Sequence, residues 1–315
     1  MNKSTVRIVN YATANGPRLG FLVDGAIVDL EASLGGTQPE MVTRVTDLVD
    51  PRAYALVRRA YERIRSGSLN VESLDATKAH LLPPVENPSK VFWIDGNYPV
   101  HNLFEENGLP LPTDWSKWLP TMYLRPPSSI LGHEATVQIP EFVDKVWASA
   151  EVGLVAGKRA RSIDLNEAGD SILGYTVALD MASDVPQIGG RRIDQGNDKS
   201  WIGLYGKWLD DLSPIGPCLV PREFIDIDNA RVTLKVNGVR MQDFSTSDRF
   251  FSMEEILYTA ASLMTVNPGD IFATGSGRRT PFVLKDGDVV EAEVEGIGLL
   301  RVRVDMKKGR RPSGR

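Results

Sequence analysis

Two short apolar segments constrain the fold more than any other feature of the chain. They span residues 147–157 and 174–183, and their composition is typical of β-strands. Each segment carries a single acid, Glu151 in the first and Asp180 in the second. An ionised carboxylate in an apolar strand costs free energy unless a cation or several hydrogen-bond donors meet it. The two acids therefore need an explanation.

Two interpretations of these acids are open. An acid at the edge of a sheet can point into water, and this is the favoured interpretation for either residue taken alone. Alternatively, two acids brought together from separate strands can hold a divalent metal, because oxygen ligands suit such ions.

Most of the other segments also predict strands. Residues 18–23 and 26–30 flank Asp24-Gly25, which is a strong hairpin signal. Many strands, few helices and frequent Gly or Pro turns indicate an α+β, mostly β fold. We expect a mixed β-sandwich or roll rather than a doubly wound sheet.

Helical spacing appears in only two regions. Residues 38–66 predict two helices that Pro51 separates. Residues 252–265 predict a third helix, which Ser252 and Glu255 begin with a capping box.

A Pro-rich connector at residues 81–88 is the best candidate domain boundary. It predicts a small N-terminal α+β domain over residues 1–82 and a larger domain over 86–305. The basic end, residues 306–315, is expected to be a solvated tail.

Composition excludes several classes of function. The 36 basic and 41 acidic residues leave a net charge of −5, so nucleic acid is not an expected partner. The N-terminus lacks an apolar signal region and no apolar run approaches membrane-spanning length, so we expect a soluble cytoplasmic protein without a membrane partner. Cys218 is the only cysteine, which excludes a disulfide framework and favours a small core residue.

Only three histidines can take part in acid–base chemistry. His101 follows a predicted strand and precedes Glu105 and Glu106, which is typical of a general base with a carboxylate that orients it. A salt-bridged surface histidine is nearly as well supported. His80 and His133 are expected at the surface.

The order of several short motifs is more specific than any one of them. They are Asn97-Tyr-x-x-His101, Tyr123-Leu-Arg-Pro-Pro-Ser, Glu151 with Gly157-Lys158, Gly174-Tyr-Thr-Val, Asp180, Gln187, Gly206-Lys207, Pro214-Ile-Gly-Pro217, Val236-Asn-Gly238, Gln242, Thr246-Ser-Asp248, Pro268-Gly-Asp270 and Ala273-Thr-Gly275. In this order, over roughly residues 85 to 305, the chain resembles the fumarylacetoacetate hydrolase superfamily. The first eighty residues resemble the small domain that many members carry.

The resemblance implies a metal site for Mg²⁺ or Mn²⁺. Members hold the ion with a Glu-x-Glu pair on one strand and an Asp on the next. Glu151 matches the second Glu and Asp180 the Asp, whereas Ser149 occupies the first Glu position. Residues two apart on a strand share a face, so Ser149 is expected to point at the site and the ion to be held less tightly. Asp95 is a further carboxylate that could compensate.

The resemblance also implies catalytic and substrate-binding residues. His101, oriented by Glu106, matches the general base, and Lys207 matches a lysine near the metal and the reacting carbonyl. By the same resemblance, the substrate side comprises Gln187, Tyr205, Thr274, Gly275 and Ser276, the last three in a loop whose backbone N–H groups can hold an oxyanion.

One departure concerns the substrate carboxylate. Members commonly have an Arg four residues after the metal Asp, where this chain has Asp184. A carboxylate beside Asp184 needs Arg191, Arg192 or Arg278 to compensate.

The implied reaction is metal-assisted hydrolysis of a C–C bond in a β-diketo acid of the acylpyruvate type, through an enolate. Alternatives on the same site are a tautomerase or isomerase, a hydratase, or a decarboxylase of a 2-oxo acid. A member that binds without turnover is a third possibility. We expect a small oxo-acid or diketone as ligand, and a homodimer.

Overall fold

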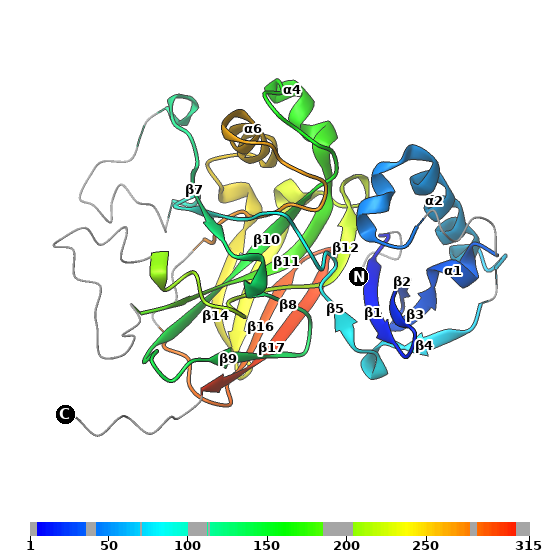
Figure 1. Cartoon of the computed structure of the whole chain (residues 1–315), viewed down its shortest axis with the longest axis horizontal. Coiled ribbons are helices and arrows are strands. Elements are labelled where there is room, and N and C mark those ends of the chain that lie inside the picture. Colours follow the sequence, from blue (N-terminus) through cyan, green and yellow to red (C-terminus); the bar gives the residue numbers. More distant parts are fainter. Residues whose placement is uncertain are drawn as a thin grey trace.

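The computed structural model describes residues 5–35, 42–69, 71–99, 112, 114–184, 204–277 and 282–306. Its strands form two mixed sheets, which confirms the prediction of a mostly β, α+β fold (Figure 1). Among the described helices, none is both long and apolar enough to cross a membrane.

The large sheet has twelve strands. Ten of them follow one path: β4 (Ser73–Asp75), β3 (Ala26–Asp29), β2 (Gly16–Val23), β1 (Ile8–Thr13), β12 (Ser213–Pro221), β11 (Ile172–Ser183), β10 (Val146–Ala156), β15 (Ile271–Ala273), β6 (Val91–Asp95) and β7 (Thr121–Arg125). In addition, β5 (Leu81–Leu82) pairs with β1, and β8 (Ile130–Leu131) pairs with β12.

The small sheet has five strands and covers one face of the large one. Its order is β14 (Val239–Ser245), β13 (Arg231–Val236), β16 (Val289–Val294), β17 (Gly298–Met306) and β9 (Ala135–Ile139). One apolar core joins the inward faces of the two sheets. Leu154 of β10 and Leu179 of β11 are fully buried in it, and burying each side chain stabilises the fold by roughly 1.5–3 kcal/mol.

The helices are short and lie outside the two sheets. The α-helices are α1 (Leu30–Ser33), α2 (Pro51–Arg65), α4 (Leu165–Ala168) and α6 (Met253–Leu263). Single turns of 3₁₀ helix are η2 (Val45–Val49), η3 (Ala76–Lys78), η4 (Trp115–Lys117), η5 (Pro127–Ser129), η6 (Gly169–Ser171), η7 (Arg222–Phe224), η8 (Ile227–Asn229) and η9 (Thr246–Asp248).

Two local predictions are confirmed. The hairpin between β2 and β3 turns at Asp24-Gly25, where both residues have positive φ, 48° and 83°. These values match the tight turn that suits the twist of paired strands. Ser252 and Glu255 form the predicted capping box, so α6 begins where expected.

One local prediction is wrong in part. Within the described residues of 38–66, the segment before Pro51 forms the five-residue 3₁₀ helix η2 rather than an α-helix. Asp47 accepts hydrogen bonds from the backbone N–H groups of Thr43 and Arg44, which fixes a tight turn. Pro51 is then the first residue of α2, where its missing N–H costs nothing.

The N-terminal region extends the large sheet, because β1 pairs with β12 through Ile8 and Leu219. It lies at one side of the molecule with α1 and α2 on its outer surface (blue in Figure 1). The proposed domain boundaries at 82 and 86 stay a prediction. Residues 307–315 of the predicted tail lie outside the described residues.

Candidate active site on the face of β10 and β11

Ser149, Glu151 and Asp180 lie on one face of the two longest strands; we call this the acid face. The antiparallel register places Ser149 directly opposite Asp180, and Glu151 opposite Ala178. Opposite residues in such a pair share a face, so the prediction that Ser149 points at the same side as the acids is confirmed. The other face of β10 packs into the core between the sheets.

Glu151 is buried, with 2% of its surface exposed. Its Oε2 accepts a hydrogen bond of 2.8 Å from the backbone N–H of Gly275, just after β15. Gly275 has φ +90°, and a Cβ there would lie 3.0 Å from the Cβ of Asn97. A glycine is therefore needed to bring this N–H against the carboxylate.

Asp180 lies between two cations. Its Oδ1 accepts from Arg125 Nη2, and its Oδ2 accepts from Lys207 Nζ at 2.6 Å. The Arg125 side chain is fully buried and also donates to the Leu212 carbonyl at 2.6 Å. Its guanidinium stacks 4.4 Å from the Trp93 ring centroid, which fixes its orientation.

The described residues of the site bring two carboxyl groups and two cations together. Burial raises the pKa of Glu151 well above its usual range, and the charge of Asp180 raises it further. The Gly275 N–H, Lys207 and Arg125 oppose this rise. Two carboxylates thus face two cations on one surface of the sheet.

Two side chains that sequence reasoning left without a role hold the backbone around the site. Gln242 Oε1 accepts from the N–H of Ala150 at 2.8 Å, between Ser149 and Glu151, the two predicted ligand positions of β10. Asn97 donates to the Thr274 carbonyl at 2.8 Å and accepts from the N–H of Phe251 at 2.9 Å. Asn97 therefore ties the end of β6 to the loop after β15.

Comparison with known proteins assigns the family. The sequence profile described as "Fumarylacetoacetate (FAA) hydrolase C-terminal" matches residues 90–305. The chain belongs to the fumarylacetoacetate hydrolase family. It is 32% identical over 307 residues to the Xenopus laevis protein named oxaloacetate tautomerase fahd2, mitochondrial, covering 94% of this chain and 89% of the relative.

Solved structures share the fold. Maleylpyruvate hydrolase from Sphingobium sp. SYK-6, determined with manganese(II) and pyruvate, has a TM-score of 0.72 at 24% identity, covering 95% of this chain and 99% of that chain. The 2-hydroxyhepta-2,4-diene-1,7-dioate isomerase from Mycobacterium marinum has a TM-score of 0.69 at 22% identity, covering 97% and 100%. Fumarylacetoacetate hydrolase folds thus carry different named activities.

The donor set on the acid face fits the hard divalent ion that the family implies. Glu151 and Asp180 offer carboxylate oxygens and Ser149 a hydroxyl, which are ligands that Mg²⁺ and Mn²⁺ accept. Glu151 Oε1 accepts no hydrogen bond from any described residue. Among these residues no three His, Cys, Asp or Glu side chains are grouped closely enough to hold a metal ion. A compensating role of Asp95 stays a prediction.

The structure describes three of the remaining predicted site residues and not the other three. Ser276 is buried beside Gly275, and the Thr274 hydroxyl donates to the Val152 carbonyl at 3.1 Å within the fold. Tyr205 is 40% exposed and its ring lies 5.3 Å from that of Trp208. His101, Glu106 and Gln187 lie outside the described residues.

Asp184 has a structural partner of its own. Its Oδ1 accepts from the backbone N–H groups of Asp144 at 3.3 Å and Lys145 at 3.1 Å. The acid therefore holds the turn before β10, which accounts for a carboxylate at this position. Arg191, Arg192 and Arg278 lie outside the described residues.

Proposed function

We propose that this protein is a metal-assisted enzyme that interconverts the keto and enol forms of a 2-oxo acid, with oxaloacetate as the first substrate to test. The observation that carries the proposal is the Lys207 ammonium held 2.6 Å from Asp180 on the face that also bears Glu151. The named activity of the Xenopus laevis relative, which is similar along 94% of this chain, supports the same reaction.

Enolisation removes a proton from C3 of the 2-oxo acid, and the reverse step returns it. We propose His101, oriented by Glu106, as the base that takes and returns this proton.

Glu151, Asp180 and Ser149 would hold Mg²⁺ or Mn²⁺, and the bound ion would supply Lewis-acid polarisation of the substrate carbonyl. Lys207 stabilises negative charge that develops on the substrate oxygen. Arg125 is a positioning residue, because its buried guanidinium orients the Asp180 carboxylate.

Oxaloacetate provides the direct test, since the enol and keto forms differ in ultraviolet absorbance. We expect the protein with Mg²⁺ or Mn²⁺ to accelerate their interconversion, and Lys207→Met to lower the rate by roughly 100- to 1,000-fold. Lys78→Met is the matched control, because Lys78 is exposed and, among the residues that the structure describes, its one ion pair is with Asp75 at the surface. An equal rate in all three proteins contradicts the assignment.

C–C bond hydrolysis of an acylpyruvate is the second candidate. The buried Ser276 beside Gly275 favours it, because this loop lies against Glu151 and has the composition of an oxyanion-binding turn. The reaction also needs a base that activates water, for which we propose His101 oriented by Glu106. Only hydrolysis yields two carbon fragments, so product analysis with wild type and His101→Ala separates the two reactions.

A chain that binds without turnover remains the alternative to both enzymes. Calorimetric titration with Mg²⁺ and Mn²⁺ distinguishes it, since the enzyme proposals require binding at millimolar metal. We further propose a homodimer in the cytoplasm that acts on small molecules, with neither nucleic acid nor membrane as a partner.

A further inference from the structure

A second hollow, whose wall contains none of the acid-face side chains, lies where the N-terminal region meets the two sheets; we call it the junction cavity. Its volume is about 880 Å³, within the range of small-molecule sites. The apolar part of its wall comes from both regions and comprises Leu22, Val23, Ile64, Leu81, Pro217 and Ile297. Sites of this kind occur preferentially between structural units.

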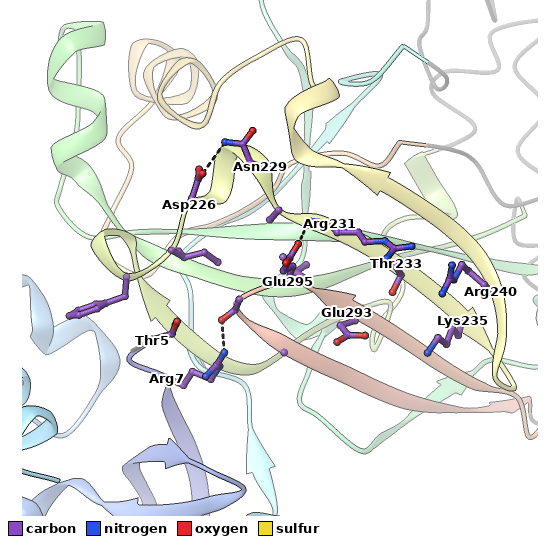
Figure 2. Close-up of a pocket in the computed structure, with 16 residues that line it drawn as sticks. Thr5, Arg7, Asp226, Asn229, Arg231, Thr233, Lys235, Arg240, Glu293 and Glu295 are labelled. Atoms are coloured by element: carbon purple, nitrogen blue, oxygen red, sulfur yellow. Dashed lines mark hydrogen bonds between the residues drawn. The ribbon is translucent and has the colours of Figure 1, made fainter. Parts of the chain in front are cut away.

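Arg7 reaches across this junction from the segment before β1. Its Nε donates to the Ile297 carbonyl at 2.9 Å and its Nη2 to the Gly296 carbonyl at 2.9 Å. These bonds hold the guanidinium in place but leave its charge without a carboxylate partner among the described residues. Figure 2 shows Arg7 directed at the turn between β16 and β17, where it also lines the neighbouring hollow described below.

Arg65, in the last turn of α2, adds a second cation to the cavity wall. It is exposed and forms no ion pair within the described part of the chain. Burial raises the pKa of Tyr61, while Arg65 and Arg7 lower it and Asp24 raises it. All three charges therefore lie around the Tyr61 phenol, whose hydroxyl donates to the Thr5 carbonyl at 3.0 Å.

The other charges of the cavity are already balanced. Arg301 pairs with Glu134 and Glu291, each at 3.0 Å. His133, expected at the surface, is half-buried because the start of β17 covers it. Its Nδ1 accepts from the Arg301 N–H at 3.2 Å, and burial lowers its pKa, so it is neutral and offers an Nε2–H donor.

A neighbouring hollow of about 740 Å³ on the outer face of the small sheet provides a contrast. Figure 2 shows its wall of alternating basic and acidic side chains, including Arg231 and Arg240. Both arginines pair with Asp243, at 2.5 Å and 3.0 Å. This face neutralises itself across its strands, and its wall lacks the continuous apolar part of the junction cavity.

We propose that the junction cavity binds a small organic monoanion with an apolar body, such as an aliphatic or aryl carboxylate. Arg7 and Arg65 contribute two positive charges and Asp24 one negative charge. The remaining positive charge favours a ligand with one anionic head group. The apolar wall takes the body of the ligand, and burial of that surface supplies the driving force. The proposal does not rest on the 2-oxo acid reaction.

Octanoate is the probe for this site, with acetate as an anion that lacks the apolar body. Calorimetry on the full chain is expected to show saturable octanoate binding at one site, with acetate at least roughly tenfold weaker. Arg7→Gln removes a charged hydrogen-bond donor and is expected to weaken octanoate roughly tenfold. Ala79→Trp fills the cavity from its N-terminal side and is expected to abolish binding.

Two further variants make the result decisive even if Arg7→Gln is poorly folded. Arg65→Gln is expected to weaken octanoate about threefold, since its charge is partly screened. Arg63→Gln, in the same turn of α2 but outside the cavity wall, is expected to change nothing. Absence of octanoate binding, or binding that neither Ala79→Trp nor Arg65→Gln alters, overturns the proposal. So does binding that Lys207→Met abolishes, because that result places octanoate on the acid face.

Discussion

The acid face and the junction cavity both gather charged side chains, but they balance charge differently. On the acid face, Asp180 contacts Arg125 and Lys207, and the two carboxylates equal the two cations in number. In the junction cavity, Arg7 and Arg65 have no carboxylate partner among the described residues. The ion pairs on the acid face fix the orientation of the side chains that we propose for catalysis. The unpaired arginines around the junction cavity can instead attract an anionic ligand.

The largest expected effect comes from removing the centre of the paired network. Asp180→Ala leaves the buried guanidinium of Arg125 without its counter-charge, which is expected to cost about 3–5 kcal/mol of unfolding free energy. Urea unfolding in the presence of a chelator measures it. Asp243→Ala is the matched control, because Asp243 also contacts two cations but at the surface, and about 1 kcal/mol or less is expected there. Equal losses in both variants contradict the contrast.

Restoring the missing carboxylate has the next largest effect. Ser149→Glu places a third acid opposite Asp180, so we expect Mn²⁺ to bind at least roughly tenfold more tightly. The metal-free variant is expected to lose about 1–2 kcal/mol, because a third negative charge joins two carboxylates. Ser149→Gln has a similar shape without the charge, and calorimetric titration of both variants compares them. Tighter Mn²⁺ binding by Ser149→Gln as well speaks against the charge argument.

The pH dependence of stability tests the buried half of the acid face. Because burial raises the pKa of Glu151, the folded state binds more protons than the unfolded state. Stability is therefore lost as the pH rises above the unfolded pKa of about 4.3. Metal-free Glu151→Gln is expected to gain stability relative to wild type as the pH rises from about 4.3 towards the raised pKa of Glu151. Glu72→Gln, at an exposed acid, is expected to show no such gain, and a pH-independent difference for Glu151→Gln contradicts the burial argument.

The smallest effect is expected in the junction cavity. Arg65 is exposed and unpaired, so Arg65→Gln is expected to change the unfolding free energy by about 0.5 kcal/mol or less. Urea unfolding without ligand measures this change. A loss above about 1.5 kcal/mol indicates that Arg65 supports the fold rather than a ligand.

The sequence predicted those features that depend only on neighbouring residues in the chain. The turn at Asp24-Gly25, the capping box at Ser252 and the shared face of Ser149 and Glu151 follow from backbone conformation and strand periodicity. The burial of Cys218 followed from its apolar setting, and burial raises the pKa of this thiol to about 12.

Contacts between distant segments could not be predicted in this way. Arg125 meets Asp180 across 55 residues of sequence, and β1 joins the large sheet by pairing with β12. The hydrophobic pattern around Arg125 and in β1 does not indicate which distant segment each of them contacts. An arginine inside a predicted strand was the one visible sign, because a buried cation requires a counter-charge. The position of His133 likewise depends on β17, more than 150 residues later.

Exchange of hydrogen at C3 of oxaloacetate in D₂O, followed by NMR, tests the central proposal most directly. Enolisation predicts deuterium incorporation above the buffer rate in the presence of Mg²⁺ or Mn²⁺, retained in Lys78→Met and lost in Lys207→Met. Exchange at the buffer rate in the wild-type protein with saturating metal would contradict the proposal that the acid face enolises this 2-oxo acid.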